Sequence, residues 1–241
     1  FGFPLDLTQL IASERNIAID VDEYNTKMAE QRAMGRANWK GSGDAGHEVS
    51  AITELNATTE FTGYTETSHE ANIVALFDQS GKAVQTLSTA GSVVLDRTPF
   101  YGESGGQVGD TGSLWVGNTE IPVKDTQKPT PDLVEHQIDS PMVKLTVGQR
   151  VLASIAVDSR LLSRRNHTAT HLLHAALRKV LGNHVTQKGS LVTPERLRFD
   201  FSHHKSVSPT ELNNIQRLVQ KEIEANNRID VCFCSMVQAK A

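Results

Sequence analysis

The sequence contains few of the features that mark a secreted or membrane-spanning protein. Only two of its 241 residues are cysteines, Cys232 and Cys234, and their spacing of two residues makes a poor disulfide pair. The chain has no run of about 18 apolar residues, and no signal-peptide pattern opens it. Aromatic residues make up only 5%, although the hydrophobic content of 38% is sufficient for a core. We therefore expect a soluble cytoplasmic protein with no membrane partner.

The chain also lacks the excess of positive charge that is typical of proteins with general affinity for DNA or RNA, since its net charge is −4. The charge is unevenly distributed. Residues 160–205 carry a net charge of +7, whereas residues 1–159 carry −11. The basic residues of this block are Arg160, Arg164, Arg165, Arg178, Lys179, Lys188, Arg196, Arg198 and Lys205. Charge alone is consistent with a local phosphate-binding face and equally with a solvated helix surface.

Hydrophobic periodicity divides the chain into three parts. Residues 1–46 have the pattern of a helical segment that ends in a Gly-rich linker. Residues 47–158 contain short apolar runs separated by turn signals at residues 79–82 and 116–118, which predicts a small β-barrel domain. Residues 159–241 switch to helices mixed with strands. The expected fold class is α+β, with the barrel followed by an α+β domain and preceded by the helical segment.

The third part gives the clearest signals of secondary structure. Apolar residues between Ala169 and Val180 recur on one face of a helix. Strands are predicted at residues 189–192 and 197–202, and again at 229–236. Between them, the run Ser-Pro-Thr-Glu at residues 208–211 is a capping box with proline at the first helical position, which predicts a second helix.

Two histidines, His167 and His171, lie four residues apart on the first predicted helix. This spacing allows both imidazoles to reach one metal ion. They lie opposite the apolar stripe, so we expect them to face a second surface rather than the core. A pair alone is weak support for a metal, because zinc normally has three or four protein ligands. A further ligand could come from His174, His203, His204 or a cysteine, and the spacing selects none of them.

The other local signal is a glycine-rich run at residues 98–110, which holds four glycines within eight residues. Glycine permits a positive φ or a close approach of two backbones, so such a run can line a sugar or phosphate site or simply form a tight barrel corner. It has no Lys-Ser/Thr ending and is therefore not a nucleotide P-loop. If it shares a site with the histidines, we expect it to face them, well within about 20 Å of His171.

Four motifs of this sequence, in this order, resemble those of the alanyl-tRNA synthetase editing region. They are residues 98–110 (TPFYGESGGQVGD), 166–177 (NHTATHLLHAAL), 184–192 (HVTQKGSLV) and 197–203 (LRFDFSH). Residues 1–7 with 14–16 are similar to the end of the helical segment that precedes this region in the family. The resemblance spans nearly the whole chain and implies a β-barrel followed by an α+β editing core.

The family binds zinc through a His-x3-His pair, matching His167 and His171, and a later Cys-x3-His pair. The chain contains no Cys-x3-His run, and we expect that it is part of a longer protein and ends before that motif. Zinc is thus the implied cofactor, with an incomplete ligand set. The other residues implied at the site are Gln187 and Thr170 as polar catalytic contacts, Arg164, Arg165 and Lys188 as contacts to tRNA phosphates, and Glu103, Ser104, Gly105, Gly106 and Gln107 as an active-site loop.

The activity implied is hydrolysis of tRNA(Ala) that carries serine or glycine, with the acceptor end of the tRNA as partner. ATP and magnesium serve the family's aminoacylation half, whose motifs are absent here, so we expect no aminoacylation by this chain alone. Two alternatives stay open. One is a tRNA-binding or structural module without activity, and the other is a free-standing trans-editing deacylase. A deacylation assay separates an enzyme from a binding module.

Overall fold

The computed structural model describes residues 21, 23, 26, 27, 52, 55, 57–139 and 141–228. From Ile52 on, these residues belong to one compact unit, Glu48–Ala241. The helical segment expected at residues 1–46 and the strand expected at 229–236 lie outside the described residues, apart from four helical positions near residue 24. The proposed domain boundaries at residues 46/47 and 158/159 stay predictions.

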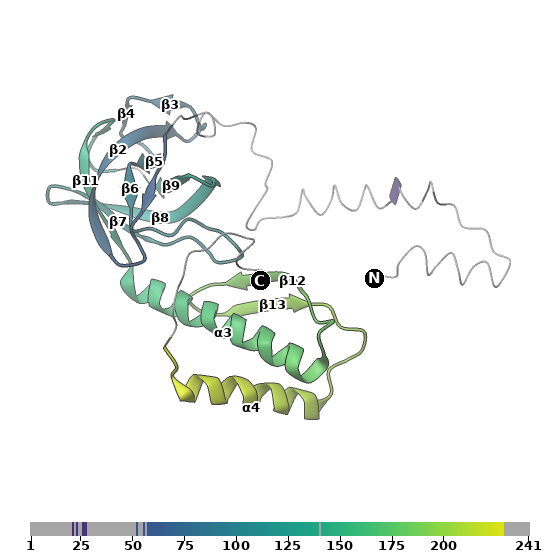
Figure 1. Ribbon diagram of the computed structural model, residues 1–241. Coiled ribbons are helices and arrows are strands. Elements are labelled where there is room, and N and C mark those ends of the chain that lie inside the picture. The colour runs from purple at the N-terminus through teal and green to yellow at the C-terminus, as the bar shows by residue number, and fades with distance from the viewer. Residues whose placement is uncertain are drawn as a thin grey trace. The chain divides into compact units, whose positions relative to one another are not determined.

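A closed barrel of six strands forms the first half of this unit (Figure 1). Its strands pair in the order β11–β7–β8–β9–β5–β2, and β2 pairs with β11 to close the ring. Their bounds are β2 Ser68–Asp78, β5 Gly91–Leu95, β7 Gly112–Val116, β8 Thr119–Thr130, β9 Leu133–Ile138 and β11 Arg150–Ile155. Short strands complete the rim: β1 Glu60–Phe61, β3 Ala83–Val84, β4 Thr86–Leu87, β6 Arg97–Thr98 and β10 Leu145–Thr146. Closure pairs the strand edges that an open sheet would expose.

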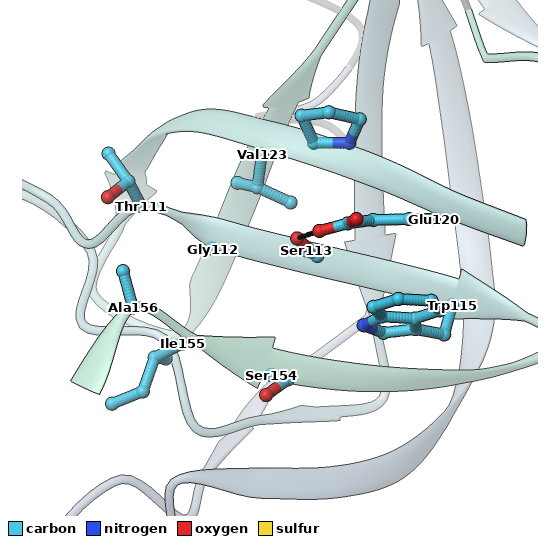
Figure 2. A pocket seen from close by; sticks show the side chains of 10 residues that line it. Thr111, Gly112, Ser113, Trp115, Glu120, Val123, Ser154, Ile155 and Ala156 are labelled. Atoms are coloured by element: carbon cyan, nitrogen blue, oxygen red, sulfur yellow. Dashed lines mark hydrogen bonds between the residues drawn. The ribbon is translucent and has the colours of Figure 1, made fainter.

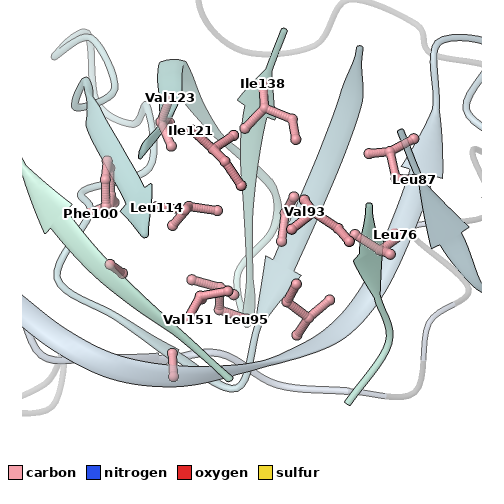
Figure 3. Close-up of a cluster of buried hydrophobic side chains, with 14 of the residues drawn as sticks. Leu76, Leu87, Val93, Leu95, Phe100, Leu114, Ile121, Val123, Ile138 and Val151 are labelled. Atoms are coloured by element: carbon pink, nitrogen blue, oxygen red, sulfur yellow. The ribbon is translucent and has the colours of Figure 1, made fainter. Parts of the chain in front are cut away.

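The barrel is filled by apolar side chains from every wall strand (Figure 3). Val93, Leu95 and Leu114 have no exposed surface, and alternate residues of β8, such as Ile121 and Val123, point to the same interior. This alternation is the period of two that a half-buried strand requires. The two predicted turns are confirmed, with Gly81 and Gly117 at positive φ between the strands they join.

The second half of the unit consists of two helices and a two-stranded hairpin. Helix α3 spans Val157–Leu181, β12 spans Gln187–Val192, β13 spans Leu197–Phe201 and α4 spans Pro209–Ala225. In Figure 1, α3 lies between the hairpin and α4. Ala176, Leu177, Val185 and Ile215 are buried between these elements. The fold class expected from the sequence, a β-barrel followed by an α+β part, is confirmed.

Helix α3 is much longer than the helix predicted over Ala169–Val180, because it begins at Val157 directly after the last barrel strand. Only its second half carries the apolar stripe that packs against the hairpin and α4. Its first three turns leave Leu161 and Leu162 partly exposed. None of the helices in the described part of the chain is both long and apolar enough to span a membrane.

Candidate functional site

The glycine-rich loop connects β6 to β7 and contains a tight turn. Ser104 and Gln107 form a backbone bridge, with N···O distances of 3.2 and 3.0 Å in the two directions. Between them, Gly105 and Gly106 both have positive φ, at 61° and 87°. Two consecutive residues of positive φ are disfavoured for side chains with a Cβ, which accounts for the paired glycines.

This turn is fastened to the hairpin by backbone hydrogen bonds. The Val192 amide donates to the Gly106 carbonyl at 2.7 Å, and the Val108 amide donates to the Val192 carbonyl at 3.1 Å. A Cβ on Gly106 would lie 2.5 Å from the carbonyl oxygen of Ser190 and closer still to its hydroxyl. The absence of a side chain at Gly106 therefore allows the loop to lie directly on β12, next to α3.

The loop reaches the histidine pair through Gln107, whose side chain is buried. Gln107 Oε1 lies 2.6 Å from His167 Nδ1, and His167 Nε2 lies 3.1 Å from His171 Nε2. Because an amide oxygen can only accept, Nδ1 of His167 must carry the proton and donate it. The neutral ring then has its Nε2 lone pair directed toward His171. The expected juxtaposition of the loop and the histidines is therefore present.

The histidine pair fits a metal ion in both spacing and protonation. Two ligands about 2.05 Å from a tetrahedral zinc ion lie about 3.3 to 3.4 Å apart, close to the observed Nε2–Nε2 distance of 3.1 Å. Burial, followed by the charge of His171, lowers the pKa of His167, which favours the neutral form that binds metals. A carboxylate, a backbone carbonyl or water on the outer nitrogen usually fixes the tautomer of a metal-binding histidine, and here the side-chain oxygen of Gln107 takes that position.

No third histidine, cysteine or carboxylate among the described residues joins this pair. Of the further ligands considered from the sequence, His174 packs against Phe199 with ring centroids 5.1 Å apart. This contact places His174 beside the hairpin. His203 and His204 cluster with His184 instead. The cysteines lie outside the described residues.

A buried ion pair joins the end of the loop to the first turn of α3. Arg160 Nε donates to both carboxylate oxygens of Asp110 at 2.9 Å. Its other nitrogens donate to the carbonyls of Gly63, at 2.9 Å, and Pro99, at 2.7 Å. The Arg160 side chain is only 11% exposed, so its inclusion in a basic surface block was wrong. The eight other basic residues of that block are exposed.

The remaining residues implied at the site lie on α3, on β12 and in the loop. Thr170 is buried on α3, and its hydroxyl donates to the Asn166 carbonyl at 2.9 Å. Gln187 and Lys188 are exposed at the start of β12. Glu103 accepts a hydrogen bond from Gln127 of β8 at 2.9 Å, which directs its carboxylate toward the barrel. Arg164 and Arg165 are exposed on α3, and Ser104 and Gly105 are exposed in the loop.

Sequence patterns did not indicate three of these contacts. Gln107 and His167 are 60 residues apart, and Asp110 and Arg160 are 50 apart. The third is the Asn166 side chain, which donates to the carbonyls of Thr193 and Pro194 after β12. Of the three, only the Asn166 contact had a signal in the sequence. Asn166 is a polar residue directly before the candidate ligand His167, and such a residue can be expected to have a hydrogen-bond partner.

An open hollow on the barrel wall is distinct from this site (Figure 2). It lies between β7, β8 and β11, and Trp115 and Pro122 contribute to its lining. Its one carboxylate, Glu120, accepts a hydrogen bond from Ser113. No histidine or cysteine lines the hollow, and its one carboxylate already has a partner, so the histidine pair and the loop form the stronger candidate site.

Comparison with known proteins finds similarity to the same family that the motifs resemble. Residues 1–159 match the family model of class II (A) tRNA synthetases. The chain is 44% identical over 230 residues to the alanine–tRNA ligase of Nitratidesulfovibrio vulgaris, covering 94% of this chain and 26% of that protein. It is 44% identical over 244 residues to that of Nitrobacter winogradskyi, covering 100% and 27%. The chain thus spans about a quarter of the length of these relatives.

Proposed function

The chain belongs to the family of class II (A) tRNA synthetases, and we propose that it is the part of an alanine–tRNA ligase that hydrolyses tRNA(Ala) charged with serine or glycine. The observation that carries this proposal is the contact of the loop residue Gln107 with His167, which joins two separate motifs into one polar site. Ligation of alanine with ATP and magnesium would belong to the longer protein and is not proposed for these residues.

The need for such a site follows from the size of alanine. A pocket for a methyl side chain cannot strongly exclude glycine, which is smaller, or serine, which adds a single hydroxyl. A second site that hydrogen-bonds the serine hydroxyl can select serine, because its polar groups would be left unpaired by alanine. Gln187 and Thr170 are our candidates for these polar contacts. Since the Thr170 hydroxyl donates to Asn166, Thr170 can offer only its lone pairs.

The histidine pair would hold zinc, which supplies polarisation of a water molecule or of the ester carbonyl when bound. His167 and His171 would each contribute Nε2. Gln107 accepts a hydrogen bond from Nδ1 of His167 and so holds this ring in the orientation that presents Nε2 to the ion. Two ligands are fewer than zinc normally has, so we propose that the pair alone holds the ion weakly.

Exposed cations on α3 and β12 would contact the acceptor end of the tRNA. Arg164 and Arg165 precede His167 by two or three residues, and Lys188 follows Gln187 directly, so all three flank residues of the candidate site. Contacts to phosphates fix the position of a nucleic acid without reading its sequence. This arrangement would place the 3′ end of the tRNA, which carries the amino acid, at the histidine pair.

Deacylation of Ser-tRNA(Ala) in the presence of zinc tests the proposal. The assay compares this chain, a version extended past Ala241, and His171→Ala in each, with His69→Ala on barrel strand β2 as the control. We expect hydrolysis of Ser-tRNA(Ala) and not of Ala-tRNA(Ala), a loss of rate in His171→Ala and an unchanged rate in His69→Ala. Absence of hydrolysis by both versions, with tRNA binding retained, would favour a binding module instead.

A further inference from the structure

Three histidines outside the candidate site meet at the end of α3 that lies away from the barrel (Figure 1). His184 follows α3, and His203 and His204 follow β13. One ring nitrogen of each lies within 4.8 Å of those of the other two, and His184 Nε2 lies 2.9 Å from His203 Nδ1. We propose that His184, His203 and His204 form a separate binding site for a divalent transition metal ion of the zinc class.

The spacing of the three rings suits a tetrahedral ion. Nitrogen ligands of zinc lie about 3.3 to 3.4 Å from one another. Here His184 Nε2 and His203 Nδ1 are 2.9 Å apart, and one nitrogen of each ring lies within 4.8 Å of the other two. The ring centroids are 4.8 to 5.1 Å apart. His184 and His204 are exposed, so an ion can enter from solvent, and a three-histidine set leaves a fourth position for water.

The donor atoms restrict the kind of ion. All three are imidazole nitrogens, which suit zinc, copper, nickel or cobalt, whereas magnesium and calcium prefer oxygen ligands. Among the described residues, the one hydrogen-bond contact of these rings joins His184 to His203, and none of the three rings makes such a contact with a carboxylate or a carbonyl. His203 Nε2 is buried without a hydrogen-bond partner. The nitrogen of His203 that faces His184 is Nδ1, so Nδ1 would bind the ion and Nε2 would lie on the outer side of the ring.

The proposed ion would connect two segments that are distant in sequence. His184 belongs to the connection between α3 and β12, while His203 and His204 belong to the connection between β13 and α4. From His171 to the end of α3 at Leu181 the helix rises about 15 Å, so this site is separate from the candidate editing site. Because an ion that binds only the folded state stabilises it, zinc should raise the stability of this half of the unit.

The test measures zinc binding where the editing pair cannot contribute. The background is the double variant His167→Ala/His171→Ala, titrated with zinc chloride by calorimetry and with cobalt chloride by absorption. We expect one equivalent of ion per chain. Adding His204→Ala, an exposed position, should weaken binding at least tenfold, because even indirect partners of a metal change affinity about 10- to 100-fold. His69→Ala is the matched control and should leave binding unchanged, and magnesium chloride should give no binding.

Two results would overturn the proposal. One is the absence of saturable zinc binding in the double-variant background, with its far-ultraviolet circular dichroism intact. The other is zinc binding that His204→Ala and His203→Gln leave unchanged. Both results are read from zinc binding in a background without the histidine pair, whereas the deacylation assay reads hydrolysis, so failure of this site and failure of the proposed function can be distinguished.

Discussion

Two adjacent glycines in the loop differ in their surroundings and give a matched pair of variants. Both have positive φ, but a Cβ on Gly105 would meet nothing within 4 Å, whereas one on Gly106 would collide with Ser190. We expect Gly105→Ala to cost about 1 kcal/mol of unfolding free energy from backbone strain. Gly106→Ala should cost clearly more and should abolish deacylation, because the loop must leave β12. Equal urea midpoints and equal rates for the two variants would contradict this assignment.

His136 in the barrel predicts how stability depends on pH. Its ring is fully buried, with Nδ1 donating to the Val93 carbonyl at 2.9 Å and Nε2 accepting from Thr98 at 2.8 Å. Burial lowers the pKa of His136 from 6.5 to about 4. Between these values the unfolded chain binds a proton that the folded chain does not, so the free energy of unfolding should fall as pH falls, by up to about 3 kcal/mol.

Urea unfolding between pH 4 and pH 8 measures this loss. His136→Gln lacks the titrating group, so the variant should be less stable at pH 7 but should lose less stability on acidification than the wild type. The difference between the two curves isolates His136 from the other histidines. Parallel curves would show that His136 does not have the lowered pKa.

At the scale of single elements, the start of α4 depends on its capping box. Ser208 Oγ accepts from the Glu211 amide, and the Glu211 carboxylate accepts from the Ser208 amide at 2.8 Å. Hydrogen bonds to the Glu211 carboxylate, first from the Ser208 amide and then from the Ser208 hydroxyl and Lys205, lower the pKa of Glu211 to about 2. Ser208→Ala should cost about 1 kcal/mol of unfolding free energy, measured by urea denaturation. The exposed Ser206, two residues earlier, is the control, and an equal effect of Ser206→Ala would refute the cap.

The elements that could be predicted are those whose signals are local. The capping box placed the start of α4, and alternation along Leu197–Phe201 indicated β13. Helix α3 was predicted over its apolar half only. Its first turns are held by Arg160 and Asn166, whose partners at Asp110 and Thr193 are tertiary contacts. Such contacts have no periodicity, and for the same reason the histidine pair was found from the sequence while its partner Gln107 was known only as a loop residue.

Across the whole molecule, the charge distribution predicts salt-sensitive tRNA binding despite the net charge of −4. Arg164→Ala with Arg165→Ala should lower the slope of log affinity against log salt by about 0.7 to 0.9 for each tRNA phosphate that the variant no longer neutralises. Fluorescence anisotropy with tRNA(Ala) between about 50 and 200 mM KCl measures the slope. Arg217→Ala on α4, outside the basic block, is the control. An unchanged slope would remove Arg164 and Arg165 from the interface.

The central claim, that the loop and α3 form one hydrolytic site, is tested most directly by a double-mutant cycle between Gln107 and His167. Deacylation rates of Ser-tRNA(Ala) are measured for Gln107→Ala, His167→Ala and the double variant, in the version of the protein that is active. If Gln107 acts by orienting His167, the double variant should be no slower than His167→Ala alone, because residues that act as a unit are not additive. If the two losses instead multiply, Gln107 and His167 act independently and the account of a shared site is wrong.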